Sequence, residues 1–197
     1  MARRYGRGDV QFFERFGWVY DLATNPVPPV SLDPALVFAE RPIDRVLDIA
    51  GGTGRATEPL LDTAEIVPVI DAASTMCQRA RLHGRISIRG DVENFPVSND
   101  AVDAVVIGDA LHHLPTVSHF FDEAARVLAP GGVLLIEEID PSTALGNLIA
   151  AGEDLMGFDS RFFTPERLCT ILTDTGFEPR IAVSGVRYLV AGRVSVR

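Results

Sequence analysis

Apolar positions recur along the chain with two periodicities, one helical and one typical of strands. Phe12, Phe13, Phe16 and Tyr20 recur at helical spacing and predict an amphipathic helix over residues 9–23. A proline-rich break at residues 25–29 separates it from a weaker helix expected over 32–40. From residue 44 onward, short apolar runs alternate with helical stretches, which predicts βαβ units and a parallel sheet.

The predicted sheet ends in a hairpin. We expect buried strands at residues 45–50, 65–70, 85–89, 103–107 and 133–137, and helices at 55–62, 74–82 and 117–128. Thr164, Pro165 and Glu166 predict the start of a last helix, with a capping hydroxyl, a proline at the first position and an acid in the first turn. Two strands near 178–183 and 186–191 are joined by Ser184-Gly185, so we expect an antiparallel pair. The fold class is α/β.

The composition and charge of the chain exclude several classes of function. The chain has 197 residues, a formal net charge of −9 and no lysine, which excludes a Schiff-base lysine and a phosphate-loop lysine. The acidic balance argues against binding a nucleic-acid backbone. No apolar run is long enough to span a membrane, and the first residues lack the apolar core of a signal peptide. Cys77 and Cys169 fit free thiols, so we expect a cytoplasmic protein.

The strongest candidate site is a glycine-rich loop at residues 48–54 (DIAGGTG), which follows the first predicted strand. In open α/β sheets ligands bind at the carboxyl ends of the strands. The dinucleotide pattern GxGxxG fails because Thr57 takes the third glycine position. Asp71 follows the second strand and could accept hydrogen bonds from two ribose hydroxyls, while Asp91 follows the third and could accept from an adenine amine. This pattern predicts a site for adenosine without a pyrophosphate.

Five segments together resemble the motifs of class I S-adenosylmethionine-dependent methyltransferases. They are VLDIAGGTG (46–54), VIDAASTM (69–76), GDVENFP (90–96), ALHHL (110–114) and RVLAPGG (126–132). The glycine-rich loop DIAGGTG, together with Tyr20-Asp21 upstream, is similar to the corresponding loop of the ubiquinone/menaquinone-biosynthesis C-methyltransferases. The resemblance implies a Rossmann-like three-layer sandwich with a seven-stranded, mostly parallel sheet of order 3-2-1-4-5-7-6. It also implies that helices of residues 1–43 form a lid on a methyltransferase domain at 44–197.

The resemblance further implies that the site holds S-adenosyl-L-methionine and releases S-adenosyl-L-homocysteine. Asp48 would organise the loop and face the methionine amino group through water, and Asp71 would hold the ribose. Tyr20 would close over the methionine carboxylate. The remaining implied positions supply backbone to the methionine and ribose or contact the adenine. The full set of expected cofactor-binding residues is Tyr20, Asp48, Ala50, Gly51, Gly52, Gly54, Asp71, Ala72, Met76, Asp91, Val92, Gly108 and Asp109.

The catalytic candidates are His113, His112 and Asp109, which follow the fourth predicted strand and could accept a proton from a phenol or enol. Since the two histidines are adjacent, we expect only one to face the pocket. The histidines lack metal-ligand spacing, so no metal site is expected. The stretch after strand four lacks the Pro-Pro-aromatic run that base-amine methylation uses in this family, and no cysteine follows a proline. We therefore expect no nucleic-acid substrate.

The methyl acceptor that remains is a small apolar or aromatic molecule, methylated on oxygen or carbon. Quinone precursors are one class of such molecules. Aromatic residues at 12–20 and 155–163 are expected to cover its pocket. A second interpretation is a non-catalytic S-adenosylmethionine-binding or partner-scaffold protein on the same fold. A third, an NAD-dependent oxidoreductase, is disfavoured by the missing glycine and by the closing hairpin. The sequence is compatible with a monomer and with a homodimer. We expect no stable insertion into a membrane.

Overall fold

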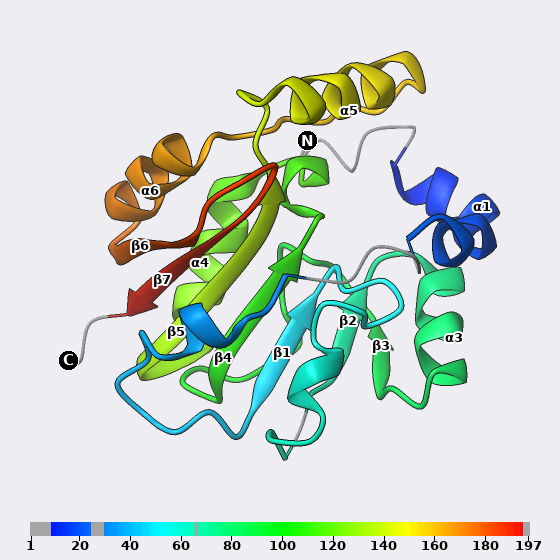
Figure 1. The fold of residues 1–197 in the computed structure, drawn as a ribbon. Helices are drawn as coiled ribbons and strands as arrows, with labels where there is room; N and C mark the ends of the chain where they lie inside the picture. Colours follow the sequence, from blue (N-terminus) through cyan, green and yellow to red (C-terminus); the bar gives the residue numbers. More distant parts are fainter. Residues whose placement is uncertain (1–8, 25–29, 66, 195–197) are drawn as a thin grey trace.

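Seven strands form one sheet in the computed structural model, which describes residues 9–24, 30–65 and 67–194 (Figure 1). The strand order is β3-β2-β1-β4-β5-β7-β6, and the expected order and closing hairpin are confirmed. The first five strands in that order run parallel, whereas β7 runs antiparallel to β5 and β6. The strands are β1 (Val46–Ile49), β2 (Val69–Asp71), β3 (Ser87–Arg89), β4 (Val102–Gly108), β5 (Leu128–Ile139), β6 (Phe177–Val183) and β7 (Arg187–Val194).

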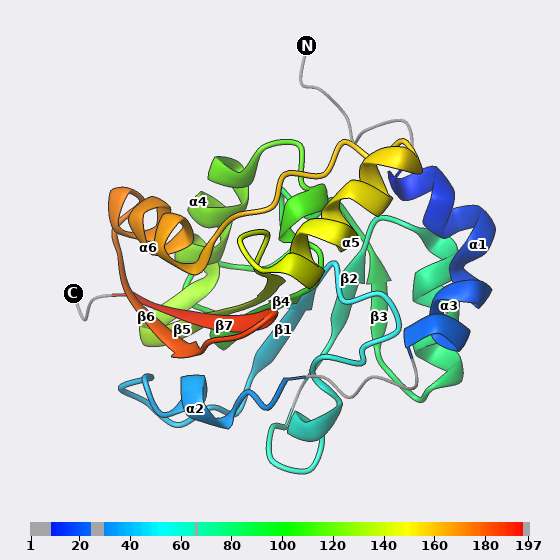
Figure 2. The same ribbon diagram turned by 45° about the horizontal axis from the view of Figure 1, so that its top comes forward.

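Helices cover both faces of this sheet and its carboxyl edge. Figures 1 and 2 both show α1 beside α3, and α5 crossing beyond the carboxyl ends of the strands. Among the described helices, none is both long and apolar enough to cross a lipid bilayer. The helices are α1 (Asp9–Thr24), α2 (Asp33–Leu36), α3 (Ser74–Leu82), α4 (Val117–Val127), α5 (Ala144–Leu155) and α6 (Pro165–Asp174).

The core consists of two apolar layers separated by the sheet. Successive side chains of β4 alternate between them: Val105 and Ile107 join the layer that includes Phe120 of α4, whereas Ala104 and Val106 join the layer beneath α2. All of these side chains are buried. Because strand side chains alternate in direction, a strand that is apolar on both faces must be covered on both faces. The result is the predicted three-layer arrangement.

Several predicted elements differ from the observed ones. The helix expected over 55–62 is wrong, because the chain forms only a short 3-10 helix at Glu58–Leu60. Pro59 has no N–H to donate, so it cannot make the hydrogen bond that would extend an α-helix there. The helix expected over 32–40 shrinks to α2, and helix α5 was not anticipated. By contrast, Thr164 caps α6 as predicted, with its side chain accepting from the Arg167 N–H. Within the described part of the chain, both cysteines are free thiols.

Candidate functional site

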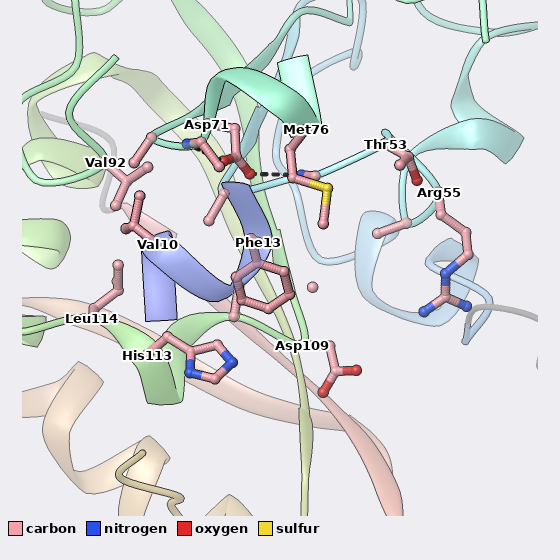
Figure 3. Close-up of a pocket in the computed structure, with 18 of the residues that line it drawn as sticks. Val10, Phe13, Thr53, Arg55, Asp71, Met76, Val92, Asp109, His113 and Leu114 are labelled. Carbon is pink, nitrogen blue, oxygen red and sulfur yellow. Dashed lines mark hydrogen bonds between the residues drawn. The ribbon is translucent and has the colours of Figure 1, made fainter. Parts of the chain in front are cut away.

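A solvent-open cavity of about 820 Å³ lies at the carboxyl ends of β1, β2 and β4 (Figure 3). The glycine-rich loop, the turn after β2 and the segment after β4 form its walls, and α1 lies across it. Ten of the sequence-predicted site residues line this cavity: Ala50, Gly51, Gly52, Asp71, Ala72, Met76, Val92, Gly108, Asp109 and His113. Residues far apart in the sequence therefore converge at the strand ends, as the α/β pattern predicts.

The glycine-rich loop needs its glycines for two different reasons. Gly52 and Gly54 adopt left-handed backbone with φ of 57° and 85°, which costs a glycine little and other residues more. Gly51 has no room for a side chain, because a Cβ there would lie 2.4 Å from the carboxylate of Asp48. Gly54 is not among the cavity-lining residues, and a Cβ at that position would lie 2.7 Å from Arg85 Nε.

Asp48 lies buried beneath the loop and does not line the cavity. Its Oδ2 accepts a hydrogen bond from Thr57 Oγ1 at 2.6 Å, and Arg85 Nη2 donates to the same hydroxyl at 2.5 Å. Burial raises the pKa of Asp48 to about 7. Its Oδ1 finds no hydrogen-bond partner within residues 9–24, 30–65 and 67–194. Asp48 thus supports the loop from below and keeps one acceptor oxygen unsatisfied.

Asp71 connects the glycine-rich loop to the start of α3. Its Oδ2 accepts from the Gly52 N–H at 3.0 Å and its Oδ1 accepts from the Ala73 N–H at 2.8 Å. A carboxylate offers about four acceptor positions, so two remain for a ligand. Burial raises the pKa of Asp71 to about 6 even though both hydrogen bonds favour the ionised form. The side chain can therefore hold the loop and accept a diol at once.

The wall beyond Asp71 is apolar. Ala72, Met76 and Val92 line it, and Val92 is buried. The neighbouring Asp91 is exposed and does not line the cavity; its Oδ1 accepts from the Glu93 N–H at 2.9 Å. The structure thus places the Val92 segment at the cavity and turns the Asp91 carboxylate toward its own loop.

Helix α1 is docked on α3 through the carboxylate of Glu14. That carboxylate accepts from the N–H groups of Ser74 at 2.8 Å and Thr75 at 3.1 Å, and from both hydroxyls. Although partial burial disfavours the charge, these hydrogen bonds lower the pKa of Glu14 to about 2. The adjacent Phe13 points into the cavity (Figure 3). The side chain of Tyr20 lies outside the described residues, so its predicted role stays a prediction.

The two adjacent histidines have different environments. His113 lines the cavity, where its ring makes edge contacts with Phe13 at 5.7 Å and Phe158 at 5.4 Å between centroids. His112 is buried, does not line the cavity, and places Nδ1 2.7 Å from Glu138 Oε2. Although burial disfavours an imidazolium, Glu138 raises the pKa of His112 to about 10. As the sequence predicts, one of the two histidines faces the pocket.

Acidic side chains at the ends of β4 and β5 complete the cavity. Asp109 lines it with a left-handed backbone at φ 55°, and burial raises the pKa of its carboxyl. Arg187 Nη2 lies 3.6 Å from Asp109 Oδ2 and 2.6 Å from Glu137 Oε1. Glu137, which also lines the cavity, was not among the predicted site residues. The signal that identified Asp71, an acid at the end of a strand, would have found it.

The aromatic cover is only partly as expected. Phe158 packs edge-on against Phe12 at 5.0 Å, and Phe162 stacks on His112 at 4.2 Å. Leu155 and Met156 are instead 90% and 59% exposed and do not line the cavity. Val10 and Leu114, which sequence reasoning did not assign to the site, also line it.

The same fold is found in solved structures of other proteins. The solved structure of a SAM-dependent methyltransferase from Thermotoga maritima, described as a possible histamine N-methyltransferase, superposes with a TM-score of 0.77. The match covers 93% of this chain and 98% of that one at 22% identity. This chain therefore has the Rossmann-like fold of S-adenosylmethionine-dependent methyltransferases.

Sequence comparison also finds methyltransferases. Residues 47–136 match the family model described as a methyltransferase domain. An uncharacterized methyltransferase of Mycobacterium tuberculosis is 34% identical over 117 residues, which are 58% of this chain and 46% of the relative. A demethylmenaquinone methyltransferase of Clavibacter sepedonicus is also 34% identical over 117 residues, 57% of this chain and 47% of the relative. The chain spans about half the length of these curated relatives.

Proposed function

We propose that this chain binds S-adenosylmethionine in the cavity and transfers its methyl group to a small apolar or aromatic acceptor. The observation that carries the proposal is the position of Asp71, whose carboxylate lines the same cavity as the glycine-rich loop and retains free acceptor capacity. The methyltransferase-domain match over residues 47–136 supports the same chemistry.

The residues present fit this cofactor. Asp71 would accept hydrogen bonds from both ribose hydroxyls, and Met76 and Val92 offer an apolar wall for the adenine ring. The backbone around Gly108 lines the cavity and would face the methionine amino group. Asp48 does not line the cavity, so its unsatisfied Oδ1 would reach that group only through a bridging water. When bound, the cofactor supplies an electrophilic methyl group, so the protein mainly has to align the acceptor with it.

Among the described residues, the acceptor side of the cavity has one aromatic ring, Phe13, beside the imidazole of His113 and the side chain of Leu114. Phe158 packs against both Phe13 and His113. Of the three catalytic candidates, His112 does not line the cavity, whereas Asp109 and His113 do, and Asp109 Oδ2 lies 3.6 Å from Arg187 Nη2. We assign His113 the role of accepting a proton from a phenol or enol. The name of the Clavibacter relative makes demethylated quinols a reasonable first group of acceptors to test.

Calorimetry with S-adenosylmethionine and S-adenosylhomocysteine tests the cofactor site. We expect micromolar binding by the wild type and a loss of roughly 10- to 100-fold in Asp71→Ala, because hydrogen bonds to a charged group contribute about 1.5–3 kcal/mol. Asp122→Ala, which removes an exposed carboxylate on α4, is the matched control and should bind normally. Failure of the wild type to bind either compound would refute the proposal.

The same preparation separates an enzyme from a non-catalytic binding protein. An open cavity lined by Phe13 and His113 favours the enzyme. We expect S-adenosylhomocysteine to accumulate with at least one phenol or quinol in an acceptor panel, and to fall sharply in His113→Asn. Tight cofactor binding without turnover on any small acceptor would instead favour the scaffold interpretation.

A further inference from the structure

Three potential ligand side chains converge beside the cavity, between the segment after β4 and helix α5. The ligand atoms of His112, His113 and Glu153 all lie within 4.8 Å of one another. We propose that these three side chains bind a divalent transition-metal ion of the zinc type. Two imidazoles and one carboxylate form a donor set that zinc and other first-row divalent metals use in proteins.

The distance between two of these ligands matches a bound ion better than a hydrogen bond. His112 Nε2 lies 3.6 Å from Glu153 Oε2, which exceeds the usual hydrogen-bond range. With metal–ligand bonds of about 2.1 Å, two ligands of a tetrahedral ion are separated by about 3.4 Å. The two atoms are therefore already spaced as if they shared an ion.

The orientation of His112 supports the same assignment. Its Nδ1 lies 2.7 Å from Glu138 Oε2, and its ring stacks on Phe162. The Glu138 carboxylate pairs with Nδ1, so Nε2 is the nitrogen that faces Glu153 and would coordinate an ion. Metal-binding histidines characteristically donate their second ring nitrogen to a carboxylate in this way. Both His112 and Glu138 are at least 98% buried, since their exposed fractions are 2% and 1%.

Glu153 is held by a second polar contact. Ser160 Oγ donates to Glu153 Oε2 at 2.6 Å and lies 3.4 Å from His113 Nδ1. The serine thus joins the carboxylate and the second imidazole, so all three candidate ligands are positioned by neighbours. A ligand set held in place in this way loses little conformational entropy on binding.

Charge gives a reason for an ion at this position. Glu138 and Glu153 both approach the single imidazole of His112. A divalent ion between Nε2 and Glu153 offsets both carboxylate charges. The Arg187 guanidinium is engaged with Asp109 and Glu137 instead.

The site would face the reaction space through His113, which also lines the cavity. Three protein ligands leave a coordination position for water or substrate. Because coordination occupies the His113 lone pair, in the metal-bound form the ion, acting as a Lewis acid on the acceptor oxygen, would take the place of His113 acting as a base. Only this last role rests on the proposed methyltransferase function; the metal site itself does not.

Titration with Zn²⁺ by calorimetry, and with Co²⁺ by visible absorption, tests the inference on the full chain. We expect one ion per chain. Glu153→Gln and His113→Asn should each weaken binding by at least about 100-fold, and Glu138→Gln by roughly 10- to 100-fold. Mg²⁺ should compete poorly because it prefers oxygen ligands.

Exposed residues of the same types provide the controls. Glu166→Gln on α6 and His119→Asn on α4 should bind Zn²⁺ like the wild type, and melting curves confirm that every variant folds. No binding by the wild type, or equal affinity in the wild type and all ligand variants, would overturn the inference. Binding of S-adenosylhomocysteine is measured separately on the wild type. Its result tests the proposed function, so a failure of the metal-site inference can be told apart from a failure of the proposed function.

Discussion

The docking of α1 can be tested by replacing Glu14 with glutamine. In the folded protein the pKa of the Glu14 carboxyl falls from 4.5 to about 2. Each pKa unit corresponds to about 1.36 kcal/mol of free energy. The full shift therefore corresponds to about 3 kcal/mol. The side chain is 29% exposed and glutamine keeps one acceptor oxygen, so we expect Glu14→Gln to cost about 1–2 kcal/mol, as for loss of a helix cap.

The sign of the pH dependence follows from the lowered pKa. Because the folded-state pKa of Glu14 lies below its unfolded value, the carboxylate stabilises the docked helix fully above about pH 4.5. That contribution is lost as the pH falls toward about 2. The difference between wild type and Glu14→Gln should therefore be constant near neutrality and shrink in acid.

Hydrogen exchange reports the docking directly, because the amides of Ser74 and Thr75 donate to Glu14. A cost of 1–2 kcal/mol should speed exchange of these amides by about 5- to 30-fold. The affinity for S-adenosylhomocysteine should also fall, since Phe13 of α1 lines the cavity. Glu166→Gln, an exposed acid at the start of α6, is the matched control. Unchanged exchange at both amides would refute the reasoning.

Three further predictions concern the cavity. Gly51→Ala should lower the free energy of unfolding by about 1–3 kcal/mol in denaturant, because the new Cβ would meet the Asp48 carboxylate. The control is Gly152→Ala, at a position with open space around it, which should be neutral or slightly stabilising. Since burial raises the pKa of Asp71 to about 6, affinity for S-adenosylhomocysteine should rise between about pH 5 and 7 and then level off; a flat calorimetric profile would contradict this. His113→Asn should lower the rate of methyl transfer by about 100-fold or more with little change in cofactor affinity; an equal loss of both would indicate a structural role.

Much of the fold follows from patterns that act over a few residues. The helix at residues 74–82 appears with the predicted bounds, and the Thr164 cap starts α6 as expected. Alternating strands and helices predicted the parallel crossovers, whereas the strand order was predicted from the family resemblance. Because parallel strands end at one edge of the sheet, the convergence of Asp71 with the glycine-rich loop could also be predicted.

Other features depend on contacts between distant parts of the chain. Glu14 lies 60 residues from Ser74, and Glu138 lies 26 residues from His112. Nothing in the local sequence around His112 indicates that Glu153 of α5 approaches it, so the three-ligand cluster was invisible to a search for metal-binding spacing. The sequence by itself determined which segments form strands and where the cofactor cavity opens. Only the packing of α1 on α3, and of α5 beside the segment after β4, decided which carboxylates are buried beside which partners, because burial and pairing depend on the whole fold.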